Sequence, residues 1–409
     1  MTEISGGVCA PTGFLAGGIR CGIKPSSQKK DLALIYSNNL CSAAAMFTTN
    51  KVKAASVQVS MENITDGNLR AVIINSGNAN ACTGKQGLAN AKAMVKAAAD
   101  AVLVSPLDVA VASTGVIGVQ LPVNLIVENI DLLKASLKDA KNGGNADALE
   151  AIMTTDTRNK EIAVEIEINN KPVRLGAMIK GSGMIHPNMA TMLGFITTDI
   201  SIIPSALDAA LRRAVKKSFN RLTVDGDTST NDMILIMANA QAYNQALTED
   251  SQDFETFCAA LDYICISLTK MLARDGEGAT KLVTVTVSGA KSEEDAEVFA
   301  KSVASSSLVK AACFGADANW GRVLCAMGYS GVEDFDPANV DVSFKSKNGL
   351  IQVCKDGETV PFNEETAKKI LLQEEIEILI DIKTGDSTAS VWGCDLTYDY
   401  VKINGDYRS

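Results

Sequence analysis

The sequence predicts an α/β fold whose sheets are mixed and largely antiparallel. Short runs rich in β-branched residues alternate with amphipathic helical stretches along the whole 409-residue chain. The run at 162–168 alternates strictly, so Glu165 and Glu167 face away from the isoleucines and one side of that strand contacts water. Because strands with one solvated side are typical of antiparallel sheets, we do not expect a fold built only from parallel βαβ units.

The expected strands are short apolar runs, and the expected helices are longer stretches with a period near 3.6. The strands are 71–75, 108–112, 162–168, 192–196, 232–237, 281–287, 376–382 and 389–394. The helices are 88–103, 122–137, 204–218 and 251–272, of which the second opens with proline, a residue favoured in a first turn. No repeat and no linker-like tract divides the chain, so the break between its halves is placed in the glycine-rich region at 180–200.

The composition excludes several classes of function. A formal net charge of −10 disfavours binding to nucleic acid. The single histidine, His186, excludes metal sites that need two or three imidazoles. The ten cysteines form no CxxC pair, and most, such as Cys325, lie among apolar residues, so we expect buried, reduced thiols. No signal sequence or membrane span is recognised, so a soluble cytoplasmic protein is expected.

Two loops start like ligand-binding motifs without completing them. Residues 77–86 follow a strand and precede a helix, but six residues separate the two glycines and Gln86 stands where a phosphate-binding loop needs a hydroxyl. The loop that begins at Asp225 has Thr230 and Ile236 where a calcium loop needs glycine and a carboxylate. Neither GxGxxG nor GxSxG occurs. We therefore expect no metal and no bound cofactor.

The segment 180–199 holds the candidate for chemistry, Thr191, which directly precedes the apolar run at 192–196. A threonine in such a place ordinarily contributes packing or turn chemistry. If the bond between Ala190 and Thr191 is cut, however, the threonine gains an α-amine with an ordinary pKa of about 7.7–8.0. That amine can take the proton of the threonine hydroxyl, so this kind of nucleophile needs no histidine. The residues alone leave both explanations open.

Eight motifs follow one another in order over almost the whole chain. They are residues 10–18, 75–80, 113–118, 153–156, 180–199, 225–232, 274–279 and 315–322. Together they resemble the ornithine acetyltransferase (glutamate N-acetyltransferase) family of arginine biosynthesis, called ArgJ. The resemblance implies a layered αββα-type fold (DmpA/ArgJ-like) and a precursor that cleaves itself between Ala190 and Thr191. The products would be an alpha chain, 1–190, and a beta chain, 191–409, paired as a heterotetramer of two alpha and two beta chains.

The same resemblance implies an acetyl transfer by a ping-pong mechanism. Thr191 would take the acetyl group from N-acetyl-L-ornithine, and L-glutamate would then accept it from the acetylated threonine. No cofactor is implied. Acetyl-CoA stays open as a co-substrate, because no motif that we recognise separates members that use it from members that do not.

The resemblance also assigns roles to matching positions. Thr114 and Gly115 match the oxyanion hole of the family, in a tight turn expected to follow the strand at 108–112. The cation of Lys180 suits a substrate carboxylate. The carboxylate of Glu277 suits either of two roles, pairing with a substrate ammonium group or orienting the Thr191 amine. His186 is given no catalytic role. The positions that match substrate contacts are Thr154, Lys180, Thr191, Glu277, Asn404 and Ser409.

Two other classes of function remain. An N-terminal-nucleophile aminopeptidase or amidase would form the same acyl-enzyme and release it to water instead of an amine. A non-enzymatic binding or scaffold protein would keep Thr191 in its core and would not be cut.

Overall fold

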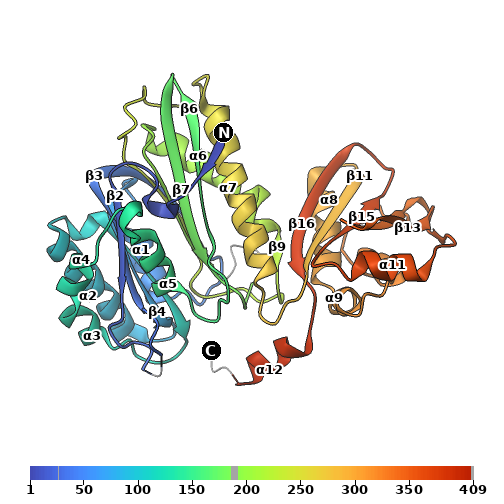
Figure 1. The fold of residues 1–409 in the computed structure, drawn as a ribbon, viewed down its shortest axis with the longest axis horizontal. Coiled ribbons are helices and arrows are strands. Elements are labelled where there is room, and N and C mark those ends of the chain that lie inside the picture. Colours follow the sequence, from blue (N-terminus) through green and yellow to red (C-terminus); the bar gives the residue numbers. More distant parts are fainter. Residues whose placement is uncertain (26, 186–191, 407–409) are drawn as a thin grey trace.

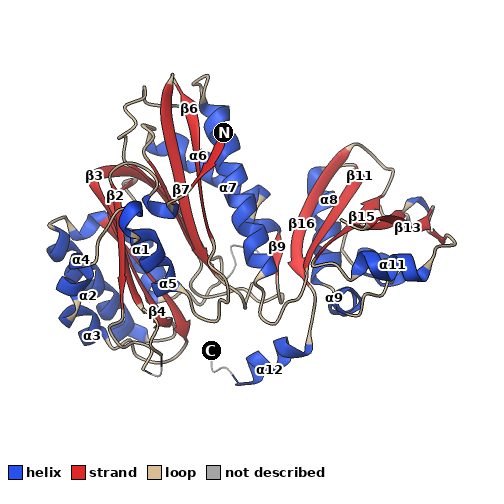
Figure 2. Ribbon diagram, viewed as in Figure 1, coloured by secondary structure: helices blue, strands red, loops and turns tan. Residues whose placement is uncertain are grey.

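The computed structural model describes residues 1–25, 27–185 and 192–406, which form two sheets with covering helices (Figures 1 and 2). The predicted cleavage site, with Ala190 and Thr191, lies outside the described residues, as do His186 and Ser409. The first sheet takes strands from both sides of that site, so the chain before residue 186 and the chain after residue 191 share one folded unit.

The first sheet has nine strands in the described chain. Its order is β1-β6-β7-β8-β10-β3-β4-β5, with β2 paired to β3. The pairs β4–β5 and β8–β10 are parallel, and the other neighbours are antiparallel. The strands are β1 (Thr2–Ile4), β2 (Phe14–Ile19), β3 (Leu32–Phe47), β4 (Asn68–Asn78), β5 (Val109–Val116), β6 (Glu161–Ile168), β7 (Lys171–Lys180), β8 (Leu193–Thr198) and β10 (Met233–Ala238).

Strand β3 joins two halves of this sheet that face each other. Its residues 32–36 pair with β2 and β4, its residues 42–47 pair with β10, and the register against β4 shifts between these parts. A buried cluster that contains Ile74 of β4 and Phe195 of β8 fills the space between the halves. The two halves are therefore the inner layers of a sandwich, packed face to face through apolar side chains.

Helices form the two outer layers, except for the helix at Gly144–Ile152, whose buried apolar residues belong to the inner cluster. One buried cluster joins α1, α2, α3 and α4 to β3, β4 and β5, and another joins α6 and α7 to β7, β8 and β10. These contacts confirm the αββα layering. The helices of this unit are α1 (Ala55–Asn63), α2 (Gly84–Val102), α3 (Val123–Glu128), α4 (Ile130–Ala135), α5 (Gly144–Ile152), α6 (Pro204–Lys217) and α7 (Phe254–Arg274).

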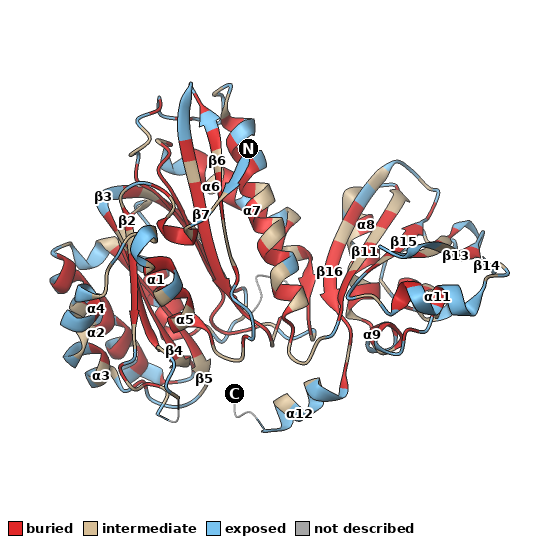
Figure 3. Cartoon of the chain, viewed as in Figure 1, coloured by how far each residue is buried: buried red, intermediate tan, exposed pale blue. Residues whose placement is uncertain are grey.

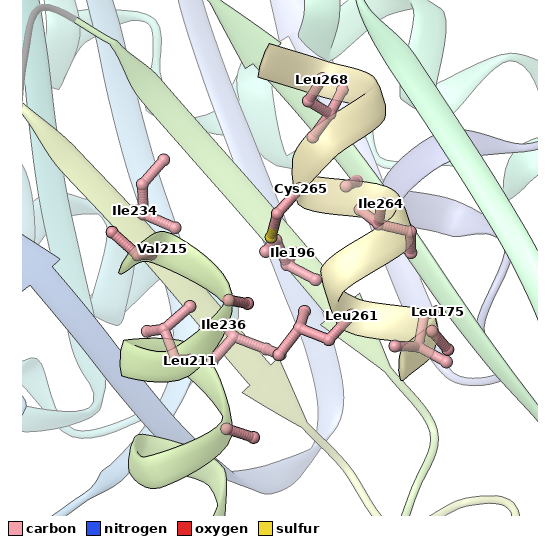
Figure 4. Close-up of a cluster of buried hydrophobic side chains, with 14 of the residues drawn as sticks. Leu175, Ile196, Leu211, Val215, Ile234, Ile236, Leu261, Ile264, Cys265 and Leu268 are labelled. Carbon is pink, nitrogen blue, oxygen red and sulfur yellow. The ribbon is translucent and has the colours of Figure 1, made fainter. Parts of the chain in front are cut away.

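Figure 4 shows the cluster beneath α6 and α7. Leu211 and Val215 of α6, four residues apart, and Leu261 of α7 pack toward Ile196 of β8 and Ile236 of β10. Helix α7 is long and apolar enough to cross a membrane by length and composition, but 56% of that apolar window is buried inside the structure. Its apolar stripe is therefore used in the core.

The second sheet has its own core, formed with the helices that follow α7 in the chain. Its order is β14-β13-β12-β15-β11-β16-β9, and the parallel pair β9–β16 connects it to the segment after α6. The remaining elements are β9 (Leu222–Thr223), β11 (Leu282–Ala290), β12 (Asp341–Ser346), β13 (Gly349–Lys355), β14 (Glu358–Thr359), β15 (Glu375–Asp381), β16 (Ser387–Cys394), α8 (Glu293–Ser305), α9 (Ser307–Phe314), α10 (Trp320–Gly328), α11 (Glu364–Leu371) and α12 (Tyr398–Asp406).

The structure confirms every expected strand and corrects three local predictions. The expected helix at 122–137 is two short helices, because the chain breaks at Asn129, which ends α3 and precedes α4. Strand β5 continues to Val116, so Thr114 and Gly115 belong to an irregular strand end and not to a turn after it. Cys82 and Cys325 are exposed, whereas the other eight cysteines are buried. All ten are free thiols.

Candidate active site

The candidate site lies at the edge of the first sheet where β7 ends and β8 and β10 begin. Antiparallel register places Lys180, the last residue of β7, opposite Leu193 of β8, and parallel register places Leu193 beside Met233 of β10. The segment that joins β7 to β8 contains Thr191, and residues 224–232 precede β10. Both connections therefore leave the sheet at one edge.

An open pocket at this edge has a volume of about 580 Å³, counting its mouth. Its wall brings together six of the residues that the sequence singled out, although they are far apart in the chain. They are Thr114, Gly115, Thr154, Lys180, Glu277 and Asn404.

Lys180 connects several walls of the pocket. Its side chain is buried, and Nζ donates to Thr154 Oγ1 at 2.8 Å and to Thr114 Oγ1 at 3.4 Å. Burial lowers the pKa of Lys180, and the nearby carboxylate of Asp156, 3.8 Å from Nζ, opposes this shift. Because both threonine hydroxyls accept from Lys180, each keeps its own hydrogen for a further acceptor.

The backbone at the end of β5 has a conformation that glycine adopts without strain and other residues do not. Gly115 has φ +133°, and a Cβ there would come 2.3 Å from the carbonyl carbon of Gly77 on the neighbouring strand. Asn231 braces this strand end, since its Nδ2 donates to the carbonyls of Ser113 and Ala79 at 2.7 Å each. The position of Thr114 is thus fixed by β4 on one side and by the loop before β10 on the other.

Glu277 joins the pocket to the C-terminal helix. Its Oε1 accepts from Thr155 Oγ1 at 2.8 Å, and its Oε2 accepts from Asn404 Nδ2 at 2.9 Å. None of the residues of α12 is buried, as Figure 3 shows, so the Asn404 contact is a specific link between α12 and the pocket wall. The Glu277 backbone N–H also donates to the Ser182 carbonyl at 2.8 Å.

Behind the pocket lies a buried ionic network that sequence reasoning missed. Lys160 Nζ contacts Asp156 Oδ1 at 2.7 Å and also bonds Asp275. Asp156 in turn accepts from the backbone N–H groups of Gly181 at 2.7 Å and Thr154 at 2.9 Å. Burial would raise the pKa of Asp156, but the ammonium groups of Lys180 and Lys160 outweigh it and hold the pKa below its ordinary value. This network fixes the backbone at Gly181, the residue after Lys180, and at Thr154, whose hydroxyl accepts from Lys180.

The loop before β10 holds both ends of the segment that contains the predicted cleavage site. Asp225 accepts from the backbone N–H groups of Met184 at 2.6 Å and Ile185 at 2.8 Å, and Asp232 accepts from that of Met192 at 3.0 Å. The sequence flagged this loop as an incomplete calcium motif but gave its aspartates no role. Among the described residues no group of histidine, cysteine and acidic side chains could hold a metal ion.

Comparisons with known proteins agree on one family. The sequence matches the model of the ArgJ family over residues 15–409. "Arginine biosynthesis bifunctional protein ArgJ" of Caldanaerobacter subterraneus subsp. tengcongensis is 49% identical over 409 residues, and that of Symbiobacterium thermophilum is 51% identical over 410, each with full coverage of both chains. The crystal structure of arginine biosynthesis bifunctional protein argJ from Bacillus halodurans is 45% identical with a TM-score of 0.50, and it covers 52% of this chain and 98% of its own.

Proposed function

The chain belongs to the ArgJ family of arginine-biosynthesis enzymes, and from that premise we propose that it moves the acetyl group of N-acetyl-L-ornithine to L-glutamate through an acetyl ester on Thr191. One observation carries the proposal. A buried cation, a carboxylate and a threonine hydroxyl line one pocket at the sheet edge where β8 begins, two residues after Thr191 in the sequence.

The pocket chemistry suits amino-acid substrates. Lys180 supplies a buried cation for a substrate carboxylate, and Glu277, held by Thr155 and Asn404, supplies a carboxylate for a substrate ammonium. Both substrates carry these groups. The Thr114 hydroxyl and the Gly115 backbone N–H would donate to the oxyanion that forms at the acetyl carbonyl.

The proposed mechanism has two acyl-transfer steps. Thr191 Oγ attacks the acetyl carbonyl, its proton passes to the Thr191 α-amine, and the amine protonates the nitrogen of ornithine as the amide bond breaks. The amino group of glutamate then attacks the ester, and the threonine hydroxyl regains its proton as acetylglutamate leaves. Neither step needs a metal or a cofactor.

Scission between Ala190 and Thr191 into chains 1–190 and 191–409 is part of the proposal. The Bacillus halodurans chain supports it, since that chain aligns over 98% of its own length yet covers only 52% of this one, as a polypeptide cut near its middle would. We further propose a heterotetramer of two alpha and two beta chains, located in the cytoplasm. The relatives are named bifunctional, and we propose acetyl-CoA as the second acetyl donor.

The test is an incubation of the purified protein with N-acetylornithine and glutamate. Formation of acetylglutamate and ornithine in equal amounts supports acetyl transfer. Release of acetate without acetylglutamate would instead support the aminopeptidase or amidase alternative, in which water resolves the acyl-enzyme. Acetyl-CoA as sole donor, with glutamate, tests the second activity separately.

We expect Thr114→Val to lower kcat by about 10²–10³-fold, because it removes one donor to the oxyanion while keeping the shape of the side chain. KM for acetylornithine should change little. Thr269→Val is the matched control, since the Thr269 hydroxyl is buried in α7 and donates to the Cys265 carbonyl. Equal kcat in Thr114→Val and Thr269→Val would contradict the oxyanion role.

We expect Gly183→Ala to weaken substrate binding by displacing Glu277. A Cβ at Gly183 would lie 2.2 Å from Glu277 Oε2, so the carboxylate must move and lose its contacts to Thr155 or Asn404. Steady-state kinetics should show KM about tenfold higher, equivalent to about 1.4 kcal/mol, with the melting temperature nearly unchanged. Gly328→Ala, where a Cβ would meet nothing within 4 Å, is the control. An unchanged KM in Gly183→Ala would show that Glu277 does not bind the substrate.

A further inference from the structure

Ser182 and Thr155 form a chain of hydrogen bonds that ends on the carboxylate of Glu277. Their hydroxyl oxygens lie 2.7 Å apart, and Thr155 Oγ1 donates to Glu277 Oε1 at 2.8 Å. A hydroxyl has one hydrogen, so Thr155 gives its hydrogen to the carboxylate and accepts that of Ser182. Ser182 is 1% exposed, and its carbonyl also accepts from the Glu277 backbone N–H at 2.8 Å. Ser182 therefore holds Glu277 directly through the backbone and indirectly through Thr155.

The loop that carries Thr155 also serves the cation of the pocket. The hydroxyl of Thr154 accepts from Lys180 Nζ at 2.8 Å, and its backbone N–H donates to Asp156 Oδ2 at 2.9 Å. Two adjacent threonines thus contact the two charged groups of the pocket wall, Thr154 the ammonium of Lys180 and Thr155 the carboxylate of Glu277. The position of one charged group is therefore tied to that of the other through a single loop.

The charge of Glu277 is open to a ligand. In the described parts of the chain its carboxylate accepts from the Thr155 hydroxyl and, at 2.9 Å, from Asn404 Nδ2, and both of these donors are neutral. Lys180, the cation of the pocket, forms its ion pair with Asp156 at 3.8 Å. A substrate ammonium that enters the pocket can therefore pair with Glu277 without displacing an ion pair.

A carboxylate that is bonded at both oxygens presents its remaining lone pairs in fixed directions. Asn404 lies on α12, which has no buried residue, whereas Thr155 is bonded to the buried Ser182. Thr155 is therefore the firmer of the two contacts that orient Glu277. N-acetyl-L-ornithine has one ammonium, at the end of its side chain, because its α-nitrogen is acetylated. That ammonium is the group that a fixed carboxylate can recognise.

We propose that Thr155 is a specificity-determining residue that positions Glu277 to bind the side-chain ammonium of the acetyl donor, with Ser182 orienting the Thr155 hydroxyl. The inference rests on the proposed function, because it takes N-acetylornithine as the donor. Thr155 acts through Glu277 and not on the acetyl group. It therefore determines which donor binds and leaves the rate of the acyl-transfer step unchanged.

The test compares two acetyl donors, N-acetyl-L-ornithine and N-acetyl-L-norvaline, with glutamate as the acceptor. Norvaline has the carbon chain of ornithine without the terminal amino group, so the ratio of the two kcat/KM values measures recognition of the ammonium. Native protein should favour acetylornithine by at least about tenfold, the effect of one hydrogen bond between charged groups. Thr155→Val should lower this ratio by about fivefold or more, through a higher KM for acetylornithine alone. Thr155→Ser keeps the hydroxyl and should keep the ratio.

Thr286→Val is the matched control. Thr286 is half-buried like Thr155, and its hydroxyl lies 2.8 Å from Ser390 Oγ in the second sheet, so the variant loses a similar hydroxyl pair away from the pocket. Its ratio should equal that of native protein. A double-mutant cycle then tests whether Thr155 acts through Glu277: in the Glu277→Gln background, Thr155→Val should change the ratio by less than about twofold.

The outcomes separate this inference from the proposed function. If native protein forms no acetylglutamate from acetylornithine, the proposed function fails. If native protein forms it but uses acetylnorvaline equally well, the inference is wrong, whether or not any variant folds. An equal loss with both donors in folded Thr155→Val would show that the residue does not act on recognition of the ammonium, and would also reject the inference. So would a fall in the ratio that is as large in the Glu277→Gln background as in native protein.

Discussion

Replacing Thr191 with alanine is expected to leave one polypeptide of 43.1 kDa and to abolish acetyl transfer. Without the hydroxyl there is no nucleophile for the acetyl group, and no side chain at residue 191 to attack the preceding peptide bond. Activity should fall by at least about 10⁴-fold, the size of effect seen when a catalytic nucleophile is removed. Intact mass spectrometry measures the chain length, and the acetylornithine and glutamate assay measures transfer.

The control for that result is Thr191→Ser. It keeps a hydroxyl and loses one methyl, so we expect the chain still to be cut and transfer still to be measurable. Both variants should fold, because the strand that follows is held by β7 and β10 and by the Met192 contact to Asp232. Full activity in Thr191→Ala would refute the nucleophile assignment, and cleavage of that variant at 190–191 would show that the hydroxyl is not needed for scission.

The sequence predicted the elements of the site well but not how they meet. Apart from Asp232 at the start of the second run, the runs at 192–196 and 232–237 are apolar, so each was expected as a strand, and each contains a buried one. Nothing local in either run indicates that they pair in parallel and in a register that puts Met192 next to Asp232. Parallel pairing depends on the tertiary path of the chain between the strands, which here includes all of α6.

The pocket residues were predicted from the resemblance to the family and not from a local sequence pattern. Asn404 contacts Glu277 across 127 positions of sequence, and a hydroxyl or amide near a chain end carries no signal of such a contact. Lys160 was missed for a different reason. Lys160 follows Arg158 and Asn159 in a polar stretch that is typical of a solvated loop, and lysines are rarely fully buried unless paired. Only the fold shows that Asp156 and Asp275 converge on it.

No change in amino-acid composition along the sequence marks the boundary between the first sheet and the second. Strand β16 of the second sheet pairs with β9, and α7 of the first unit packs against β16. The chain therefore passes from one core to the other without a flexible linker. The run at 376–382 of the second sheet mixes isoleucines with acidic residues, as the run at 162–168 of the first sheet does. A boundary that is set by which strands pair, and not by a spacer, leaves no mark in a single sequence.

Replacing Lys160 with methionine is expected to destabilise the protein by about 3–5 kcal/mol, because it leaves two buried carboxylates without their shared cation. Lys160 is 1% exposed and contacts both Asp156 and Asp275. The measurement is chemical denaturation in the Thr191→Ala background, so that native and variant proteins are compared as single chains. In the cleavable protein the same change should also raise KM, since Asp156 holds the backbone on both sides of the pocket.

The pH dependence of this effect identifies its cause. With Lys160 present, Asp156 has a folded-state pKa below its unfolded value, so its contribution to stability is complete above about pH 4 and is lost as pH falls further. Without Lys160 the carboxylate of Asp156 takes up a proton more easily, so the difference in stability between the two proteins should narrow in acid. Lys281→Met is the control, because Lys281 is buried but donates to the carbonyls of Cys313 and Phe314 and not to a carboxylate. The loss of stability in Lys281→Met should be the same at every pH, because it comes from lost packing. If the loss of stability in Lys160→Met is also independent of pH, the ionic explanation is rejected.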